Sequence, residues 1–116
     1  MPWYFSPHTG GKKIPPRVQE RTRERVEEHA RRRYASRYDR IEVRFRGALC
    51  YIDAYRDKSP HPWHLVRLRF FGDENRWTLA FFTYSHEKYE PSVFRDGSFH
   101  GTPEDALDIG AVYLTD

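Results

Sequence analysis

The sequence lacks the features that would place it in a membrane or outside the cell. Its single cysteine, Cys50, cannot form a disulfide within the chain, which fits a reducing compartment. No apolar run approaches the roughly 20 residues that a membrane-spanning helix needs. The start of the chain also lacks the charged and long apolar segments of a secretion signal. We therefore expect a cytoplasmic protein with no membrane partner.

The sequence also lacks the common nucleotide, metal and nucleophile motifs. In "SPHTGGKK", Ser6 occupies the position of the first glycine of a phosphate-binding loop, and Lys13 that of its hydroxyl residue. The two histidines of "HPWH", His61 and His64, fall short of the three or four ligands of a zinc site, and one cysteine provides no C-x-x-C pair. No G-x-S-x-G segment is present. We expect no metal and no cofactor, and the motifs favour a protein that is not an enzyme.

Charge and aromatic rings are abundant instead, at 32% and 16% of the residues. Residues 12–46 contain 13 Lys/Arg against 6 Asp/Glu, whereas residues 47–116 contain 7 against 11, so the front of the chain is basic and the rest is acidic. This division is typical of a face that binds a polyanion, or of two halves that attract each other.

The length predicts one domain over residues 1–116, with 1–13 as an irregular lead-in that is interrupted by proline and glycine. A helix is predicted over 17–38, because this segment lacks both glycine and proline. One apolar stripe recurs there every four residues: Val18, Thr22, Val26, Ala30 and Tyr34.

Period-two alternation then predicts strands. Residues 40–46 and 48–56 form a hairpin around Gly47, and further strands are expected at 64–71, at 76–85 and, as a small hairpin, at 92–100. A second helix follows Thr102, a good N-cap. The fold class is therefore α+β: an N-terminal helix, an antiparallel β-meander of four to six strands and a short C-terminal helix. Both helices are expected on the sheet face of Ile41, Val43 and Phe45.

Several strings resemble a family of small uncharacterised bacterial proteins. They are "TGGKKIP", "VRFRG" followed by "CYIDAY", "RLRFFGD", "YSHEKYE" with "SVF", and "GTPEDA". The similarity spans nearly the whole chain and is weakest in the loop after Tyr55. It implies a bacterial, cytoplasmic protein of one domain, and it brings no activity, cofactor or site residue.

Two groups of residues are candidates for binding nucleic acid. On the second face of the sheet, alternation collects Arg44, Arg46, Tyr51, Tyr55, Arg67 and Arg69, together with Asp53. On the helix, a wheel places Arg21, Arg25 and Arg32 along one flank. Arginine binds phosphate and tyrosine offers a stacking surface, although Asp53 and Glu42 can also neutralise the arginines of a purely structural face.

Three hypotheses for function follow. The first is a non-enzymatic binding module for an anionic partner such as RNA or DNA. The second is a small metal-independent ribonuclease, in which His64, His86 or Tyr84 would act with Arg44 and Arg67. The third is a structural or interaction domain whose aromatic residues bury a homodimer or a protein partner. The aromatic residues at 3–5 are expected to be able to fold over the second sheet face.

Overall fold

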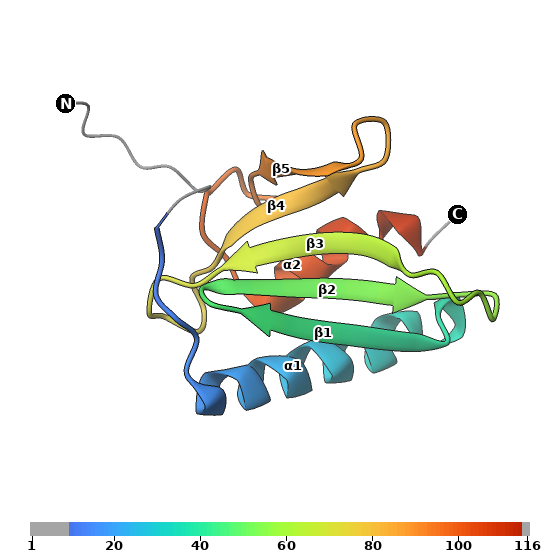
Figure 1. The fold of residues 1–116 in the computed structure, drawn as a ribbon, viewed down its shortest axis with the longest axis horizontal. Helices are drawn as coiled ribbons and strands as arrows, with labels where there is room; N and C mark the ends of the chain where they lie inside the picture. Colours follow the sequence, from blue (N-terminus) through green and yellow to red (C-terminus); the bar gives the residue numbers. More distant parts are fainter. Residues whose placement is uncertain (1–9, 115–116) are drawn as a thin grey trace.

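The computed structural model describes residues 10–114, and it has five antiparallel strands in one sheet with two helices behind it (Figure 1). In chain order the elements are α1 (Pro16–Tyr34), a 3₁₀ turn (Ala35–Arg37), β1 (Arg40–Arg46), β2 (Leu49–Tyr55), β3 (Trp63–Arg69), β4 (Thr78–Thr83), β5 (Lys88–Ser92), α2 (Pro103–Gly110) and a second 3₁₀ turn (Ala111–Tyr113). The strands are hydrogen-bonded in the order in which they occur. The predicted α+β class is confirmed.

Helix α1 begins at Pro16, whose fixed φ suits the first turn, and it ends at Tyr34 in the 3₁₀ turn. Its buried residues are four of the predicted stripe, Val18, Thr22, Val26 and Ala30, and the fifth, Tyr34, is partly buried. This stripe packs behind β1 and β2, where Val43 lies opposite Ile52 in the core. The expected position of the helices on the Val43 face is therefore confirmed.

The last strand differs from the prediction. No hairpin forms at 92–100; instead β5 pairs with β4, with Tyr89 opposite Phe82, and residues 93–100 form an irregular loop. Gly97 still makes a turn, with φ +87° and its N–H donated to the carbonyl of Phe94. Because Pro91 has no N–H to donate, this segment is suited to the edge of a sheet, and β5 lies at that edge.

Helix α2 packs closely on the middle of the sheet. The hydroxyl of Thr102 accepts a hydrogen bond from the backbone N–H of Asp105 at 3.1 Å, which confirms the predicted N-cap. At the other end, Gly110 lies directly against Leu65 and Val66 of β3. The sheet thus has one face sealed by α1 and α2.

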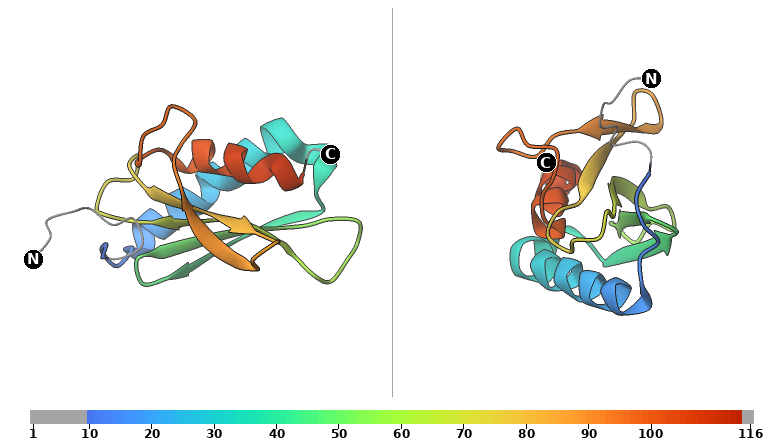
Figure 2. Two further views of the ribbon diagram at one scale, coloured as in Figure 1. Left: turned by 90° about the horizontal axis from the view of Figure 1, so that it is seen from above. Right: turned by 90° about the vertical axis from the view of Figure 1, so that its left-hand side faces the viewer.

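The other face of the sheet is not covered by any helix of the described part of the chain (Figure 2). Residues 10–14 pass along one end of the strands, where the N–H of Lys12 donates to the carbonyl of Phe70 and that of Ile14 to Gly47. In Figure 1 this side of the sheet faces the viewer, with the helices behind it. We call this side the open face.

Candidate nucleic-acid interface

Strand register brings the predicted sheet residues together on the open face. Tyr51 of β2 lies between Arg44 of β1 and Arg67 of β3. Two residues along the strands, Leu49 lies between Arg46 and Arg69. The arginines therefore form two rows about 7 Å apart along the strand direction, since each residue advances about 3.3 Å.

The charges of the open face do not balance. Facing outward are five arginines and two carboxylates: Arg40, Arg44, Arg46, Arg67 and Arg69 against Glu42 and Asp53. Among residues 10–114, Arg46, Arg67 and Arg69 make no ion pair. Burial, followed by repulsion from Arg67, lowers the pKa of Arg69, as expected for cations crowded without a counter-charge.

Aromatic rings lie between these cations. The Arg44 guanidinium lies 4.9 Å from the centre of the Tyr51 ring, and that of Arg67 lies 5.3 Å from the centre of Tyr89. Tyr51 and Tyr89 meet edge to face at 5.6 Å. Burial raises the pKa of Tyr89, and the nearby Asp53 adds to this effect, so the phenol stays neutral. Tyr55 is held at the rim under Arg40, 4.0 Å from its ring centre.

An aspartate is buried at the centre of this basic face. Asp53 is 1% exposed. Its carboxylate accepts a hydrogen bond from the Arg44 guanidinium at 2.9 Å and lies 3.1 Å from Nδ1 of His64. The imidazole also contacts the ring of Phe82, at 4.9 Å between centres. Asp53 therefore organises a cation and a histidine that reach solvent beside it.

A β-bulge places His64 on this face. In a regular strand His64 would share the core face of Val66, because alternate residues point the same way. The register shifts at this point: Val66 lies opposite Ile52, but His64 lies opposite Asp53, and Leu65 is the extra residue. Both Leu65 and Val66 are fully buried, so the bulge turns His64 outward. No sequence pattern indicated this bulge.

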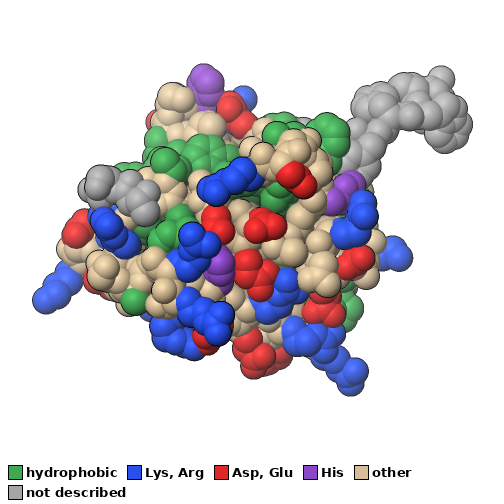
Figure 3. All heavy atoms as spheres, turned by 180° about the vertical axis from the view of Figure 1, so that it is seen from behind, with side chains coloured by type: hydrophobic (Ala, Val, Ile, Leu, Met, Phe, Trp, Pro, Cys, Tyr) green, Lys and Arg blue, Asp and Glu red, His purple; other side chains and the backbone are tan. Residues whose placement is uncertain are grey.

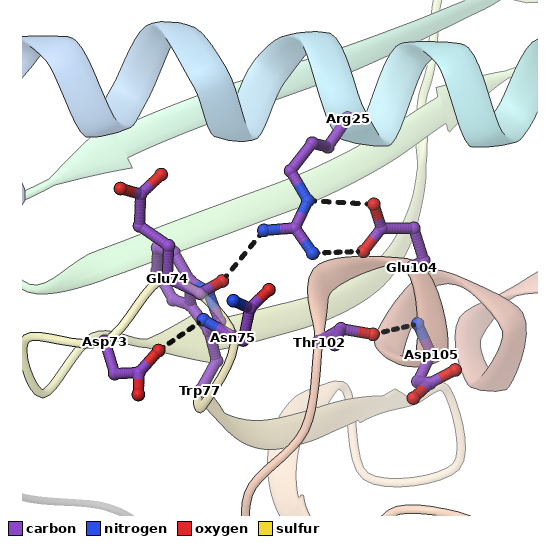
Figure 4. Close-up of polar contacts among 8 residues, drawn as sticks. All are labelled: Arg25, Asp73, Glu74, Asn75, Trp77, Thr102, Glu104 and Asp105. Carbon is purple, nitrogen blue, oxygen red and sulfur yellow. Dashed lines mark hydrogen bonds and ion pairs between the residues drawn. The ribbon is translucent and has the colours of Figure 1, made fainter.

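The predicted arginine flank of α1 is arranged differently. Arg21 makes two hydrogen bonds to the Glu74 carboxylate, at 2.9 and 2.6 Å, and Arg32 pairs with Glu28 at 3.1 Å. Arg25 donates to both oxygens of Glu104, at 2.8 and 2.7 Å, and to the backbone carbonyl of Glu74 (Figure 4). The structure therefore brings these three arginines together, but each has a carboxylate partner.

The helix-covered side as a whole mixes both signs of charge (Figure 3). A hollow of about 560 Å³ lies beside α1 and is lined by Arg21, Glu24, Arg25, Glu28, His29, Arg32 and Glu104. Its acidic and basic residues alternate, and Arg25 with Glu104 ties α1 to α2. The arginines that line this hollow therefore have carboxylate partners, whereas Arg46, Arg67 and Arg69 of the open face have none among residues 10–114.

The remaining candidates are separate from the open face. Cys50 is buried, and burial raises the pKa of its thiol, so it is not a nucleophile. His86 pairs with Glu90 at 2.8 Å in the exposed β4–β5 turn. The described residues include no group of three His, Cys, Asp or Glu that could hold a metal ion. The aromatic residues at 3–5 lie outside the described residues.

Neither of the described helices is long and apolar enough to cross a membrane. No family model matches the chain, no curated protein matches it, and no solved structure matches it. The geometry of the open face is therefore the basis for a functional assignment.

Proposed function

We propose that the protein binds single-stranded nucleic acid, RNA or DNA, on the open face of its sheet. The observation that carries this proposal is the cluster of three arginines without carboxylate partners in residues 10–114, Arg46, Arg67 and Arg69, beside the ring of Tyr51. Arginine forks bind phosphate oxygens in pairs, and aromatic rings stack on the faces of unpaired bases. A duplex hides those base faces, so the single strand is the better fit.

The arrangement also suits an extended strand rather than a single anion. Two rows of arginines, Arg44 with Arg67 and Arg46 with Arg69, lie on either side of β2 and follow the strand direction. Phosphates spaced along a nucleic-acid backbone can contact both rows at once. Tyr51, which lies between Arg44 and Arg67, can stack on a base of the same strand. The paired arginines Arg21, Arg25 and Arg32 lack this availability, so the proposal depends on the sheet.

The test is fluorescence anisotropy with short labelled oligonucleotides, single- and double-stranded RNA and DNA, at about 50 mM salt, where binding to phosphates is strongest. We expect binding to single strands, with an affinity that falls as salt rises. The variant R67Q/R69Q should bind weakly. Its salt dependence should be shallower by about 1.4 in log–log slope, or about 0.7 for each phosphate that the variant no longer neutralises.

A matched control has the same loss of charge on the helix side. Arg37, after α1, and Arg95, in the loop beside Tyr34, are both exposed. The variant R37Q/R95Q should bind like the wild type. Equal weakening of both variants would mean that net charge alone is responsible, and absence of binding by the wild type would refute the proposal.

A protein partner or a homodimer is a second candidate, because two large apolar side chains beside the edge strand β5 are exposed. Val93 is 43% exposed and Phe99 is 51% exposed. Sedimentation of the wild type and of V93S/F99S tests this candidate: a dimer that dissociates in the variant would support it, and a wild-type monomer would remove the dimer. The bacterial origin and cytoplasmic location stay predictions of the sequence.

A further inference from the structure

Three histidines of the described chain pair with a carboxylate, and one of them lies on the open face. His29 pairs with Asp108 between the helices at 2.8 Å, and His86 pairs with Glu90 in an exposed turn. His64 pairs with Asp53 at the centre of the open face. The first two pairs link neighbouring elements, whereas the third faces the proposed binding surface.

The Asp53–His64 pair has the geometry of an oriented base. Asp53 lies 3.1 Å from Nδ1 of His64, so the neutral imidazole is held with its proton on Nδ1 and its lone pair on Nε2. Within residues 10–114, Nε2 makes no hydrogen bond, and the side chain is 37% exposed. Asp53 itself is 2% exposed at its side chain. A buried carboxylate thus fixes a ring whose accepting nitrogen reaches solvent.

Two further contacts hold His64 in place. The hydroxyl of Tyr84 accepts a hydrogen bond from the backbone N–H of His64 at 2.7 Å. The bulge that turns the ring outward is locked because its extra residue, Leu65, is fully buried against Gly110 of α2. Bulges of this kind often re-aim a side chain at a functional site. His64 is therefore fixed at both its backbone and its ring.

Two arginines lie on the open face near the Asp53–His64 pair. Arg44 hydrogen-bonds the second oxygen of Asp53 at 2.9 Å, and Arg67 lies across β2 from it, over Tyr89. The side chain of Arg44 is 47% exposed, so its guanidinium remains available to an anion. A phosphate bound between these two guanidinium groups would have a base beside it and positive charge on either side.

We propose that His64 is the general base of a metal-independent cleavage of single-stranded RNA on the open face, an activity that rests on the proposed binding function. Nε2 of His64 takes the proton of a ribose 2′-hydroxyl, and the 2′-oxygen forms a bond to the adjacent phosphorus. The bond between phosphorus and the 5′-oxygen breaks, and its electron pair leaves with that oxygen, which takes a proton from water. The resulting hydroxide removes the proton from His64. The products are a 2′,3′-cyclic phosphate and a 5′-hydroxyl.

The neighbouring residues have distinct roles in this step. Arg44 and Arg67 stabilise the negative charge that develops on the phosphoryl oxygens. Asp53 is a positioning residue, because it acts through the imidazole and does not touch the substrate. The reaction needs no oxidant, reductant or metal, but it needs the 2′-hydroxyl, so DNA would be bound and left intact.

The test incubates the wild type with end-labelled single-stranded RNA in the presence of a chelator and identifies the products by mass spectrometry. We expect fragments that end in a 2′,3′-cyclic phosphate, and we expect DNA of the same sequence to remain whole. H64Q should lose at least about 100-fold in cleavage rate, the lower end of general-base catalysis, while its affinity for RNA stays within a few-fold. H86Q, which removes the other exposed histidine of a carboxylate pair, should cleave at the wild-type rate.

The role of Asp53 is tested separately with D53N, whose folding is checked by circular dichroism. Nitrogen NMR of the imidazole should show the proton of neutral His64 on Nδ1 in the wild type and the loss of that preference in D53N. The RNA assay should show slower cleavage by D53N. RNA that is bound but uncut, or equal cleavage by H64Q and wild type, would overturn the catalytic proposal alone. Absence of binding to either nucleic acid would overturn the binding proposal as well.

Discussion

The contact between Gly110 and the bulge provides a sharp test of how the fold supports the open face. A Cβ at position 110 would lie 2.9 Å from Cβ of Leu65 and 3.0 Å from Cγ1 of Val66, closer than side chains tolerate. The backbone of Gly110 is right-handed helical, with φ −69° and ψ −21°, so alanine is not strained by its own conformation. Any loss of stability in G110A therefore comes from the steric clash of the new methyl group with β3.

The magnitude follows from two opposing terms. Overpacking a well-packed core costs about 1–3 kcal/mol, whereas alanine in place of glycine gains up to about 1 kcal/mol in a helix interior, and less at the last residue of α2. We expect G110A to lower the free energy of unfolding by about 1–2 kcal/mol. At roughly 4 °C per kcal/mol for a domain of this size, Tm should fall by about 4–8 °C.

Urea unfolding and thermal melts measure this effect, and a double-mutant cycle locates it. V66A alone removes two buried methyl groups and should cost about 2 kcal/mol, but in G110A/V66A the Cγ1 atom that would lie 3.0 Å from the new methyl group is gone. The double variant should therefore be more stable than the sum of the single effects by about 0.5 kcal/mol or more. V112A, at an exposed position just after α2, should change stability by less than about 0.5 kcal/mol. Additive effects, or a G110A variant as stable as the wild type, would refute the packing argument.

Two further predictions concern ionisable groups on the helix side. E104Q, which removes the charge bound by Arg25, should cost about 1 kcal/mol in urea unfolding at neutral pH, because the pair is charge-assisted but partly exposed. Burial, the largest effect, raises the pKa of Glu104, but the hydrogen bond from Arg25, a backbone hydrogen bond and the nearby positive charges together outweigh it and leave this pKa below 4.5. The contribution is therefore lost as pH falls through that lower value, and E104Q should lack this acid dependence. Burial, and then the hydrogen bond to Asp108, raises the pKa of Tyr34 to about 12, above its ordinary value of 10.0. The contribution of Tyr34 to the free energy of unfolding should therefore be complete below pH 10 and decline as pH rises towards 12. A series of melts in which Y34F loses stability just as steeply over this range would contradict this assignment.

Local patterns predicted the elements that depend on local physics. The four-residue stripe of α1 and the alternation around Gly47 report which side of an element is buried, and the cap at Thr102 reports where a helix begins; each was confirmed. The open face was predicted for the same reason, because Arg44, Tyr51 and their neighbours occupy the positions between core residues. Periodicity therefore identified most of the candidate site.

The errors arose where the answer depends on distant residues or on an irregular strand. Arg21 is 53 residues from its partner Glu74, and Arg25 is 79 residues from Glu104, so a helical wheel showed a basic flank without the acids that neutralise it. The β5 segment has charged residues and Pro91, which hide its pairing with β4. The outward turn of His64 depends on a bulge that simple alternation does not reveal.

The two groups of arginines differ in the partners that they have within the fold. On the helix side, carboxylates satisfy Arg21 and Arg25, and the pairs connect elements that are far apart in sequence. On the open face the arginines have fewer carboxylate partners. Its one buried carboxylate, Asp53, contacts both Arg44 and His64. Burying a charge is costly unless it is paired, and here the pairing holds Arg44 and an imidazole but leaves Arg46, Arg67 and Arg69 without a carboxylate. Arg67 lies over the ring of Tyr89 and Arg69 donates to the carbonyl of Gly10, so both make contacts within the fold, but neither has a carboxylate partner among residues 10–114. In the proposed function a ligand would supply that negative charge, and the comparison of R67Q/R69Q with R37Q/R95Q tests whether it does.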